Sequence, residues 1–235
     1  MFIFTMETFA ITASFRIPES HTFQQTLSLP PVTTLTGLMG AALGLNFENA
    51  MKCRKENGIL FGVRGSNKGE MRDLWKYNKI KSGESLKDVL IREYLTDVML
   101  AIAIGSESRE ALSKVKDSFS NPKYALSAGN SDDLLKVCSV GNITEVKEEQ
   151  WSEFENTVLP GNQTFQYESL IDLKNTPITY KIKAPQVFLL PTEFSFVGEE
   201  RRVSRREQFT FVGSPIRLRD PIHAYRIDDF TVALL

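Results

Sequence analysis

Basic and aromatic residues alternate in one stretch of the chain, residues 51–81. Its acids are Glu56, Glu70 and Asp73, and its bases are Lys52, Arg54, Lys55, Arg64, Lys68, Arg72, Lys76, Lys79 and Lys81. Nine bases less three acids leave six positive charges, with Trp75 and Tyr77 among them. Cations neutralise phosphates and aromatic rings stack on unpaired bases, so this composition suits single-stranded RNA. The alternative is a solvated loop whose two aromatic rings pack down onto the core.

A second basic cluster lies between Phe196 and Phe209. It consists of Arg201, Arg202, Arg205 and Arg206. Arginine binds phosphate through two parallel hydrogen bonds, so the cluster could hold a nucleic-acid backbone. The alternative is an exposed turn in which these arginines pair with Glu199, Glu200 and Glu207. Both interpretations remain open.

A polar loop carries a third set of groups suited to nucleic acid: Arg16, His21, Gln24 and Gln25. The Pro30-Pro31 pair that follows predicts an extended entry into a helix. We expect Thr33 or Thr34 to cap that helix, whose free N–H groups and dipole would form an anion site. The same residues could equally serve only to end a strand and cap a helix.

The helix expected at residues 33–45 has two different faces. Its apolar stripe contains Leu35, Leu38, Met39, Ala42 and Leu43, and its other face has Gly37, Gly40, Ala41 and Gly44. Glycine inside a helix costs about 1 kcal/mol relative to alanine, so this face must allow a close approach to the backbone. The approaching group is either another protein element or a nucleic-acid backbone.

Residues suited to catalysis are scarce. The two histidines are His21, which suits hydrogen bonding to RNA as well as proton transfer, and His223, which we interpret as structural. The sequence has no phosphate-binding loop, nucleophile elbow or zinc motif. Cys53 and Cys138 lack metal-ligand spacing and are expected to be reduced thiols. We therefore predict no metal and no cofactor.

Composition limits the classes of function. The 235 residues are 42% hydrophobic, which is enough for a real core. The net charge of −1 excludes a generic polyanion binder, so any nucleic-acid site must be local. Residues 1–14 alternate as a strand does and have no basic leader, so we expect a cytoplasmic protein without a membrane span.

The order of expected elements is strand, helix, strand, strand, helix, strand. The strands are 1–14, 59–64, 98–104 and a closing one at 124–126. A second helix is expected after Ser106 as N-cap, with Leu112, Val115 and Phe119 on its inner face. This βαββαβ order predicts an α+β, ferredoxin-like domain like that of RNA-recognition motifs.

Two regions complete the predicted organisation. Residues 1–140 would form the ferredoxin-like domain, with the basic insertion at about 51–95. Residues 141–235 contain short β-rich runs at 178–183, 187–190 and 208–212, separated by Pro and Gly. They predict a smaller C-terminal β-rich domain or a β extension of the first domain.

Three motifs, in order, resemble one known family. They are Phe15-Arg16-x-Pro18 with Phe23-Gln24-Gln25-Thr26 and the Pro30 to Gly44 helix, then Arg92-Glu93-Tyr94-Leu95, then Pro122-x-Tyr124-x-Leu126-x-x-Gly129-x-x-Asp132. This set resembles the CRISPR-associated Cas-five family, part of the RAMP superfamily and a subunit of type I Cascade complexes. The resemblance covers roughly the first 140 residues.

The resemblance implies a role and partners. The protein would cap the 5′ handle of the CRISPR RNA (crRNA) in an I-A or I-B style complex that acts on foreign target DNA. Its partners would be the backbone subunit and the large subunit that reads the PAM. The basic insertion would be the thumb, a hairpin that props the guide RNA where the handle ends. The expected RNA contacts are Arg16, His21, Gln24, Gln25, Thr33, Thr34, Gly37, Gly40, Arg64, Lys68, Arg72, Trp75, Lys76, Tyr77, Lys79, Lys81, Arg201, Arg202, Arg205 and Arg206.

A catalytic alternative comes from one branch of the family. Type I-C relatives cut precursor crRNA with a Tyr, Lys and His set, whereas this chain has no adjacent Lys-His pair. The alternative is a metal-independent endoribonuclease that uses His21 with Tyr77 or a nearby lysine. A third interpretation is a protein-only scaffold that uses the glycine face for helix packing.

Overall fold

A computed structural model describes residues 1–20, 23–81, 84–177, 179, 181–198 and 200–235. The helices are α1 (Val32–Leu43), α2 (Phe47–Glu56) and α3 (Arg109–Ser120). The strands are β1 (Phe2–Ala13), β2 (Phe15–Arg16), β3 (Phe23–Gln24), β4 (Thr26–Leu27), β5 (Leu60–Ser66), β6 (Gly69–Lys81), β7 (Glu84–Ser106), β8 (Leu135–Val140), β9 (Thr144–Glu145), β10 (Glu149–Phe154), β11 (Thr157–Pro160), β12 (Tyr167–Ser169), β13 (Gln186–Val197), β14 (Glu200–Val212), β15 (Ile216–Ile227) and β16 (Phe230–Val232).

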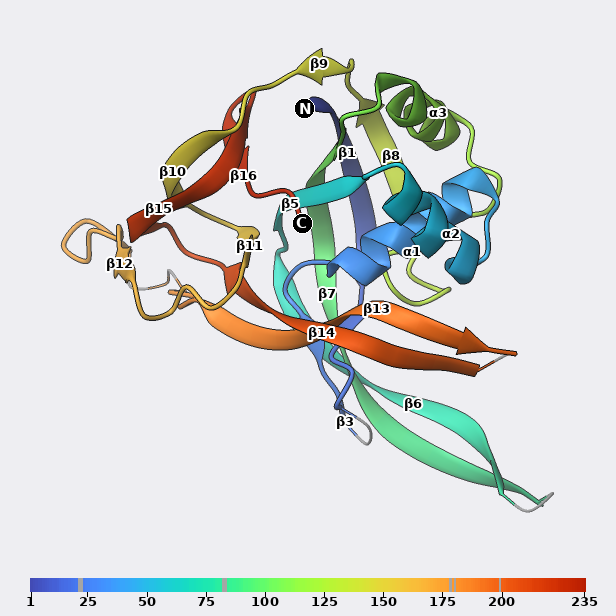
Figure 1. The fold of residues 1–235 in the computed structure, drawn as a ribbon. Helices are drawn as coiled ribbons and strands as arrows, with labels where there is room; N and C mark the ends of the chain where they lie inside the picture. Colours follow the sequence, from blue (N-terminus) through green and yellow to red (C-terminus); the bar gives the residue numbers. More distant parts are fainter. Residues whose placement is uncertain (21–22, 82–83, 178, 180, 199) are drawn as a thin grey trace.

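The structure is a mixed α/β fold dominated by an antiparallel sheet. Its main sheet has the strand order β13-β14-β11-β5-β7-β1-β8, and β1 pairs with β7 from Phe2↔Ser106 to Ala13↔Leu95. Figure 1 shows the three helices on the same side of β1, β7 and β8. The core lies between them, because the apolar faces of α1 and α3 pack there against Phe4 and Met6.

The apolar stripes that the sequence predicts for the two helices are confirmed. Leu35, Leu38, Met39 and Ala42 of α1 are buried and Leu43 is half-buried, while Leu112, Val115 and Phe119 of α3 are all buried. The start of α3 differs from the prediction: its N-cap is Ser108, whose hydroxyl accepts from Ala111 N at 3.2 Å. Ser106 is still part of β7, and its hydroxyl donates to Asn57 O at 2.7 Å.

The strand that follows α3 also differs from the prediction. Residues 124–126 are not a strand; the chain makes a single bridge at Ser127↔Leu134 and then forms β8. β8 pairs with the outer edge of β1. The predicted closing strand was therefore placed too early, because Tyr124 and Leu126 lie in the connection that leads to β8.

A long hairpin, β6 with the first part of β7, projects from the sheet, and we call it the thumb. Its pairing runs from Gly69↔Thr96 to Lys81↔Glu84, and Figure 1 shows it extending away from the helices. The predicted insertion began too early, because residues 51–56 belong to α2 and 60–66 to β5.

The C-terminal half contributes to two sheets. β11, β13 and β14 extend the main sheet, and Val158, Leu190, Phe209 and Phe211 join its core. A second sheet contains β10, β15, β12 and β16, and its residues cover part of the face of β1 and β7 opposite the helices. Two of the core clusters therefore contain residues from both sides of the boundary predicted at residue 140, whereas a third lies wholly after it. The run predicted as a strand at 178–183 has no strand among its described residues.

Candidate nucleic-acid interface

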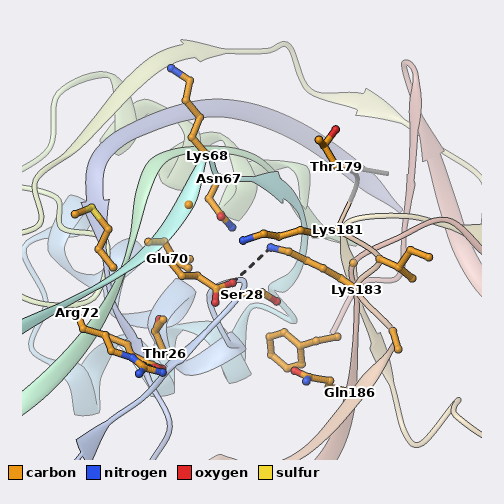
Figure 2. A pocket seen from close by; sticks show the side chains of 18 residues that line it. Thr26, Ser28, Asn67, Lys68, Glu70, Arg72, Thr179, Lys181, Lys183 and Gln186 are labelled. Carbon is orange, nitrogen blue, oxygen red and sulfur yellow. Dashed lines mark hydrogen bonds and ion pairs between the residues drawn. The ribbon is translucent and has the colours of Figure 1, made fainter. Parts of the chain in front are cut away.

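A groove of about 1230 Å³ lies at the base of the thumb (Figure 2). One wall consists of residues 67–72, where β6 begins, and the other of Thr179, residues 181–184 and Gln186; Thr26 and Ser28 also line the groove. A smaller hollow of about 280 Å³ shares Ser28, Asn67 and both lysines of the second wall, so the groove continues past them. Its volume exceeds the range of about 300–1,000 Å³ that is usual for small-molecule sites, so it suits an extended ligand.

The second wall is held in place by backbone contacts with the turn that follows β14. Lys183 N donates to Ser214 Oγ at 2.9 Å, and Ser214 N donates to Lys183 O at 3.0 Å. A Cβ on Gly213 would lie 2.5 Å from Lys183 Cβ, so this approach requires glycine. The wall is therefore positioned by Gly213 and Ser214, which are distant in sequence and hold Lys183 beside the thumb base.

Three of the four cations that line the groove lie close to carboxylates. Lys183 Nζ is 3.5 Å from Glu70 Oε1 across the groove, the contact drawn as a dashed line in Figure 2. Arg72 donates to Glu93 Oε1 from Nε at 3.1 Å and from Nη2 at 3.0 Å. Lys68 Nζ points away from the other lysines in Figure 2 and lies 3.4 Å from Asp97 Oδ2. Within the described residues, Lys181 has no ion-pair partner.

One face of the thumb carries a stack of aromatic rings. Trp75 and Tyr77 lie two residues apart on β6, with ring centroids 6.0 Å apart and planes at 27°. Trp75 is 45% exposed, so it does not pack down onto the core as the alternative interpretation required. The Tyr77 hydroxyl donates to Asp88 Oδ2 at 3.0 Å, and this hydrogen bond raises the pKa of Tyr77. The ring stack leaves aromatic surface open to a base.

Arg92 fixes the thumb to the body of the protein. Its guanidinium donates to both oxygens of Asp73 at 3.3 and 2.9 Å and to Asp132 at 3.2 Å, and it lies 5.7 Å from the centre of the Trp75 ring. The hydrogen bonds to Asp73 raise the pKa of Arg92, so its charge is permanent. Asp132 belongs to the connection before β8, which ties the hairpin to the sheet.

The predicted loop residues lie beside the thumb. β3 pairs in parallel with β7 through Phe23↔Ile91 and Gln24↔Arg92, and Arg72 lies 5.0 Å from the centre of the Phe23 ring. Gln24 is buried, while Arg16 and Gln25 are at the surface, where they contact Ser20. The prediction for His21 lies outside the described residues.

The remaining thumb cations differ in position. Lys76 is exposed on β6. Lys79 and Lys81 belong to the end of β6, and their side chains lie outside the described part of the chain. Arg64 lies on β5 between β11 and β7, and it is paired with Glu155 at 3.5 Å. Lys68 and Arg72 are thus the predicted residues that line the groove.

The glycine face of α1 does not face the groove. A Cβ on Gly40 would lie 2.7 Å from Ala50 Cβ of α2, while one on Gly37 would have Phe47 at 4.0 Å as its nearest atom. The close approach at Gly40 is therefore made by α2 of the same chain, which favours the alternative of another protein element over a nucleic-acid backbone there. Thr33 and Thr34 are also not caps: the N-cap is Pro31, without a side-chain cap.

The arginine cluster is engaged within the chain. Arg202 pairs with Glu200 at 2.7 Å, Arg206 with Glu19 at 2.7 Å, and Arg205 with Glu207. Arg201 lies 4.9 Å and 5.0 Å from the ring centres of Phe47 and Phe194. These contacts favour the interpretation of the cluster as an exposed, internally paired hairpin, although Glu199 lies outside the described residues.

Of the two histidines, His223 is the one that the structure describes. His223 Nδ1 is 3.2 Å from Glu148 Oε2, and Glu148 also accepts from the Tyr225 hydroxyl at 3.2 Å. Burial raises the pKa of Tyr225 to about 12, so it retains its proton. His223 and Tyr225 belong to β15 and Glu148 directly precedes β10, and both strands lie away from the thumb (Figure 1). The described residues contain no group of His, Cys, Asp and Glu that could hold a metal ion, and no helix among them could span a membrane.

Sequence analysis missed Lys181 and Lys183. The alternation in Lys181-Ile182-Lys183 places two cations on one side of an extended segment, which was an available signal. What the sequence does not show is the docking of this segment on Gly213 and Ser214, which brings it to the thumb base.

Comparisons with known proteins identify relatives. The family model described as "CRISPR-associated protein (Cas_Cas5)" matches residues 4–156, more than half of the chain. A chain described as "CRISPR RNA-guided surveillance complex" is 16% identical, with a TM-score of 0.55 over 93% of this chain and 91% of that one. A CRISPR protein from Archaeoglobus fulgidus is 13% identical, with a TM-score of 0.52 over 99% and 98%. A comparison with curated proteins finds no match.

Proposed function

This chain belongs to the Cas5 family of CRISPR-associated proteins, and from that membership we propose that it is a non-catalytic, RNA-binding subunit of a type I surveillance complex of the I-A or I-B style. It would hold the 5′ handle of the crRNA at the thumb base. It would also link the backbone subunit to the large PAM-reading subunit, so that the assembled complex can engage target DNA.

The groove at the thumb base is the observation that carries this proposal. Four bases line it, Lys68, Arg72, Lys181 and Lys183, against the acids Glu70 and Glu93. The chain as a whole has a net charge of −1, so this positive groove is a local feature. A single-stranded RNA needs a cationic path for its phosphates and exposed rings for its bases, and the Trp75 and Tyr77 stack belongs to the same hairpin.

The element order supports the fold that we propose for this role. In the sheet, the strands β5, β7, β1 and β8 lie side by side in that order. Along the chain, α1 and α2 come between β1 and β5, and α3 comes between β7 and β8. This order supports our proposal of a βαββαβ succession in a ferredoxin-like arrangement, with α2 and the thumb as additions.

Binding of handle RNA at several salt concentrations tests the proposal. We expect Lys181→Ala with Lys183→Ala, in the complex, to weaken handle binding and to reduce the slope of log affinity against log salt by about 0.7 for each lost phosphate contact. Lys114→Ala with Lys147→Ala, two exposed lysines outside the groove, is the matched control and should change neither quantity. An unchanged slope in the groove variant would remove the groove from the proposal.

The catalytic alternative is tested with repeat RNA incubated with the protein in EDTA. Our proposal predicts intact RNA. Cleavage that is lost in a His21→Ala variant would establish the endoribonuclease instead. The hydrogen bond from Tyr77 to Asp88, which raises the pKa of Tyr77, disfavours Tyr77 as a general base and supports the non-catalytic role.

A protein-only scaffold predicts that no RNA is retained through purification, which the ratio of absorbance at 260 and 280 nm reports.

A further inference from the structure

We propose that Glu70 is a specificity-determining residue of the groove: its carboxylate competes with phosphate for Lys183 and thereby excludes generic RNA. This inference rests on the proposed function, because it assumes that RNA is the ligand of the groove. It concerns selectivity among RNAs.

The position of Glu70 supports this role. Glu70 comes from the thumb base and Lys183 from the opposite wall, so their 3.5 Å contact crosses the space that a ligand would occupy. Both side chains are largely exposed, at 62% and 42%, so water surrounds the pair and an incoming anion can displace the carboxylate. A phosphate that reaches Lys183 must therefore replace Glu70 as its partner.

The charge balance indicates what the carboxylates do. Four bases less two acids give the groove lining a charge of +2, and neutralising Glu70 would raise it to +3. Arg72 is held in the same way by Glu93, whose side chain is only 17% exposed. An RNA that only offers phosphates therefore gains less here than the number of bases suggests, because Lys68, Arg72 and Lys183 already have carboxylate partners. An RNA whose bases and backbone fit the groove and the thumb can offset that cost.

The test measures the binding of two RNAs to the purified complex and to two variants of it, each of which loses one negative charge. The probes are oligouridine and the repeat-derived 5′ end of the guide RNA, each titrated at several salt concentrations. Glu70→Gln removes the carboxylate with little change of shape. Glu110→Gln is the matched control, because Glu110 is also exposed and ion-paired, to Lys114 at 2.9 Å on α3, outside the groove.

We expect Glu70→Gln to tighten oligouridine binding about three- to ten-fold and to steepen its salt slope by about 0.7, the value for one added phosphate contact on a single strand. Binding of the guide 5′ end should improve less, so selectivity falls. Adding Lys183→Ala should abolish the gain, and Glu110→Gln should leave both RNAs unchanged.

Two results would overturn the inference. One is oligouridine affinity that is unchanged or weaker in Glu70→Gln, which is also the result expected if Glu70 accepts a hydrogen bond from a base. The other is an equal gain in oligouridine affinity in Glu110→Gln, which would show that the effect comes from the net charge of the protein and not from the position of Glu70. If the unsubstituted complex does not bind the guide 5′ end through this subunit, the proposed function itself fails, so the two failures are distinguishable.

Discussion

Gly37 and Gly40 lie one turn apart on α1, and a side chain would meet different surroundings at each. A Cβ on Gly40 would lie 2.7 Å from Ala50 Cβ, whereas the nearest atom to a Cβ on Gly37 is 4.0 Å away. Because α2 already occupies the space beside Gly40, an alanine at this position has no room for its methyl group and cannot stabilise the helix. The same helix, at Gly37, has room for a methyl group.

The surroundings of the two glycines therefore predict opposite effects of an alanine substitution on the free energy of unfolding. We expect Gly40→Ala to lower the free energy of unfolding by about 1–3 kcal/mol, because α2 must move outward. Gly37→Ala should raise it by up to about 1 kcal/mol through helix propensity. Urea unfolding followed by circular dichroism measures both values. Equal effects of the two substitutions would contradict the close packing of α1 on α2.

At the scale of elements, the thumb depends on a small number of contacts with the body. Arg92 is the centre of one of them: its side chain is 13% exposed, and its partners Asp73 and Asp132 come from β6 and from the connection before β8. Removal of Arg92 would leave two carboxylates facing each other without the cation between them. The hairpin would then lose the contact that ties it to the connection before β8.

We expect Arg92→Ala to destabilise the thumb by about 1–3 kcal/mol, the range for breaking a hydrogen-bonded group that is largely shielded from water. Amide hydrogen exchange should become faster in residues 69–81 and 84–96 while the centre of β1 and β7 stays protected. Arg72→Ala is the control, because Arg72 is 67% exposed and pairs with one carboxylate. Its loss should cost less than about 1 kcal/mol. Equal exchange in the two variants would show that Arg92 does not fix the thumb.

Elements with a strong apolar period were predictable from sequence, and elements that depend on distant contacts were not. β1 and the stripes of α1 and α3 follow directly from spacing. α2 was interpreted as part of a basic insertion, because only Ala50 of its residues is buried and its charges dominate the segment. The basic groove was found only in part, since Lys68 and Arg72 are local to the thumb whereas Lys183 reaches it through Gly213 and Ser214.

At the scale of the whole molecule, the two halves of the chain share one sheet. β11 pairs with β5 through Thr157↔Arg64, and the Thr157 hydroxyl donates to Val63 O at 2.7 Å in the interior. Strands β13 and β14 continue the sheet from there and add Phe209 and Phe211 to the core that β1 and β7 begin. The edge of β5 and one end of the core are thus completed by residues after 141.

A fragment that ends at Val140 therefore tests the predicted domain boundary. We expect residues 1–140 to be insoluble or to unfold without a cooperative transition, because the edge of β5 and the core beside it would be open to water. The full chain should unfold in one transition, with a calorimetric enthalpy equal to the van't Hoff enthalpy.

A fragment that folds with the same thermal midpoint as the full chain would instead make 141–235 an independent unit. The wall of the groove that carries Lys181 and Lys183 would then belong to a part able to fold and move separately from the thumb, and the fixed geometry on which RNA binding depends would be lost.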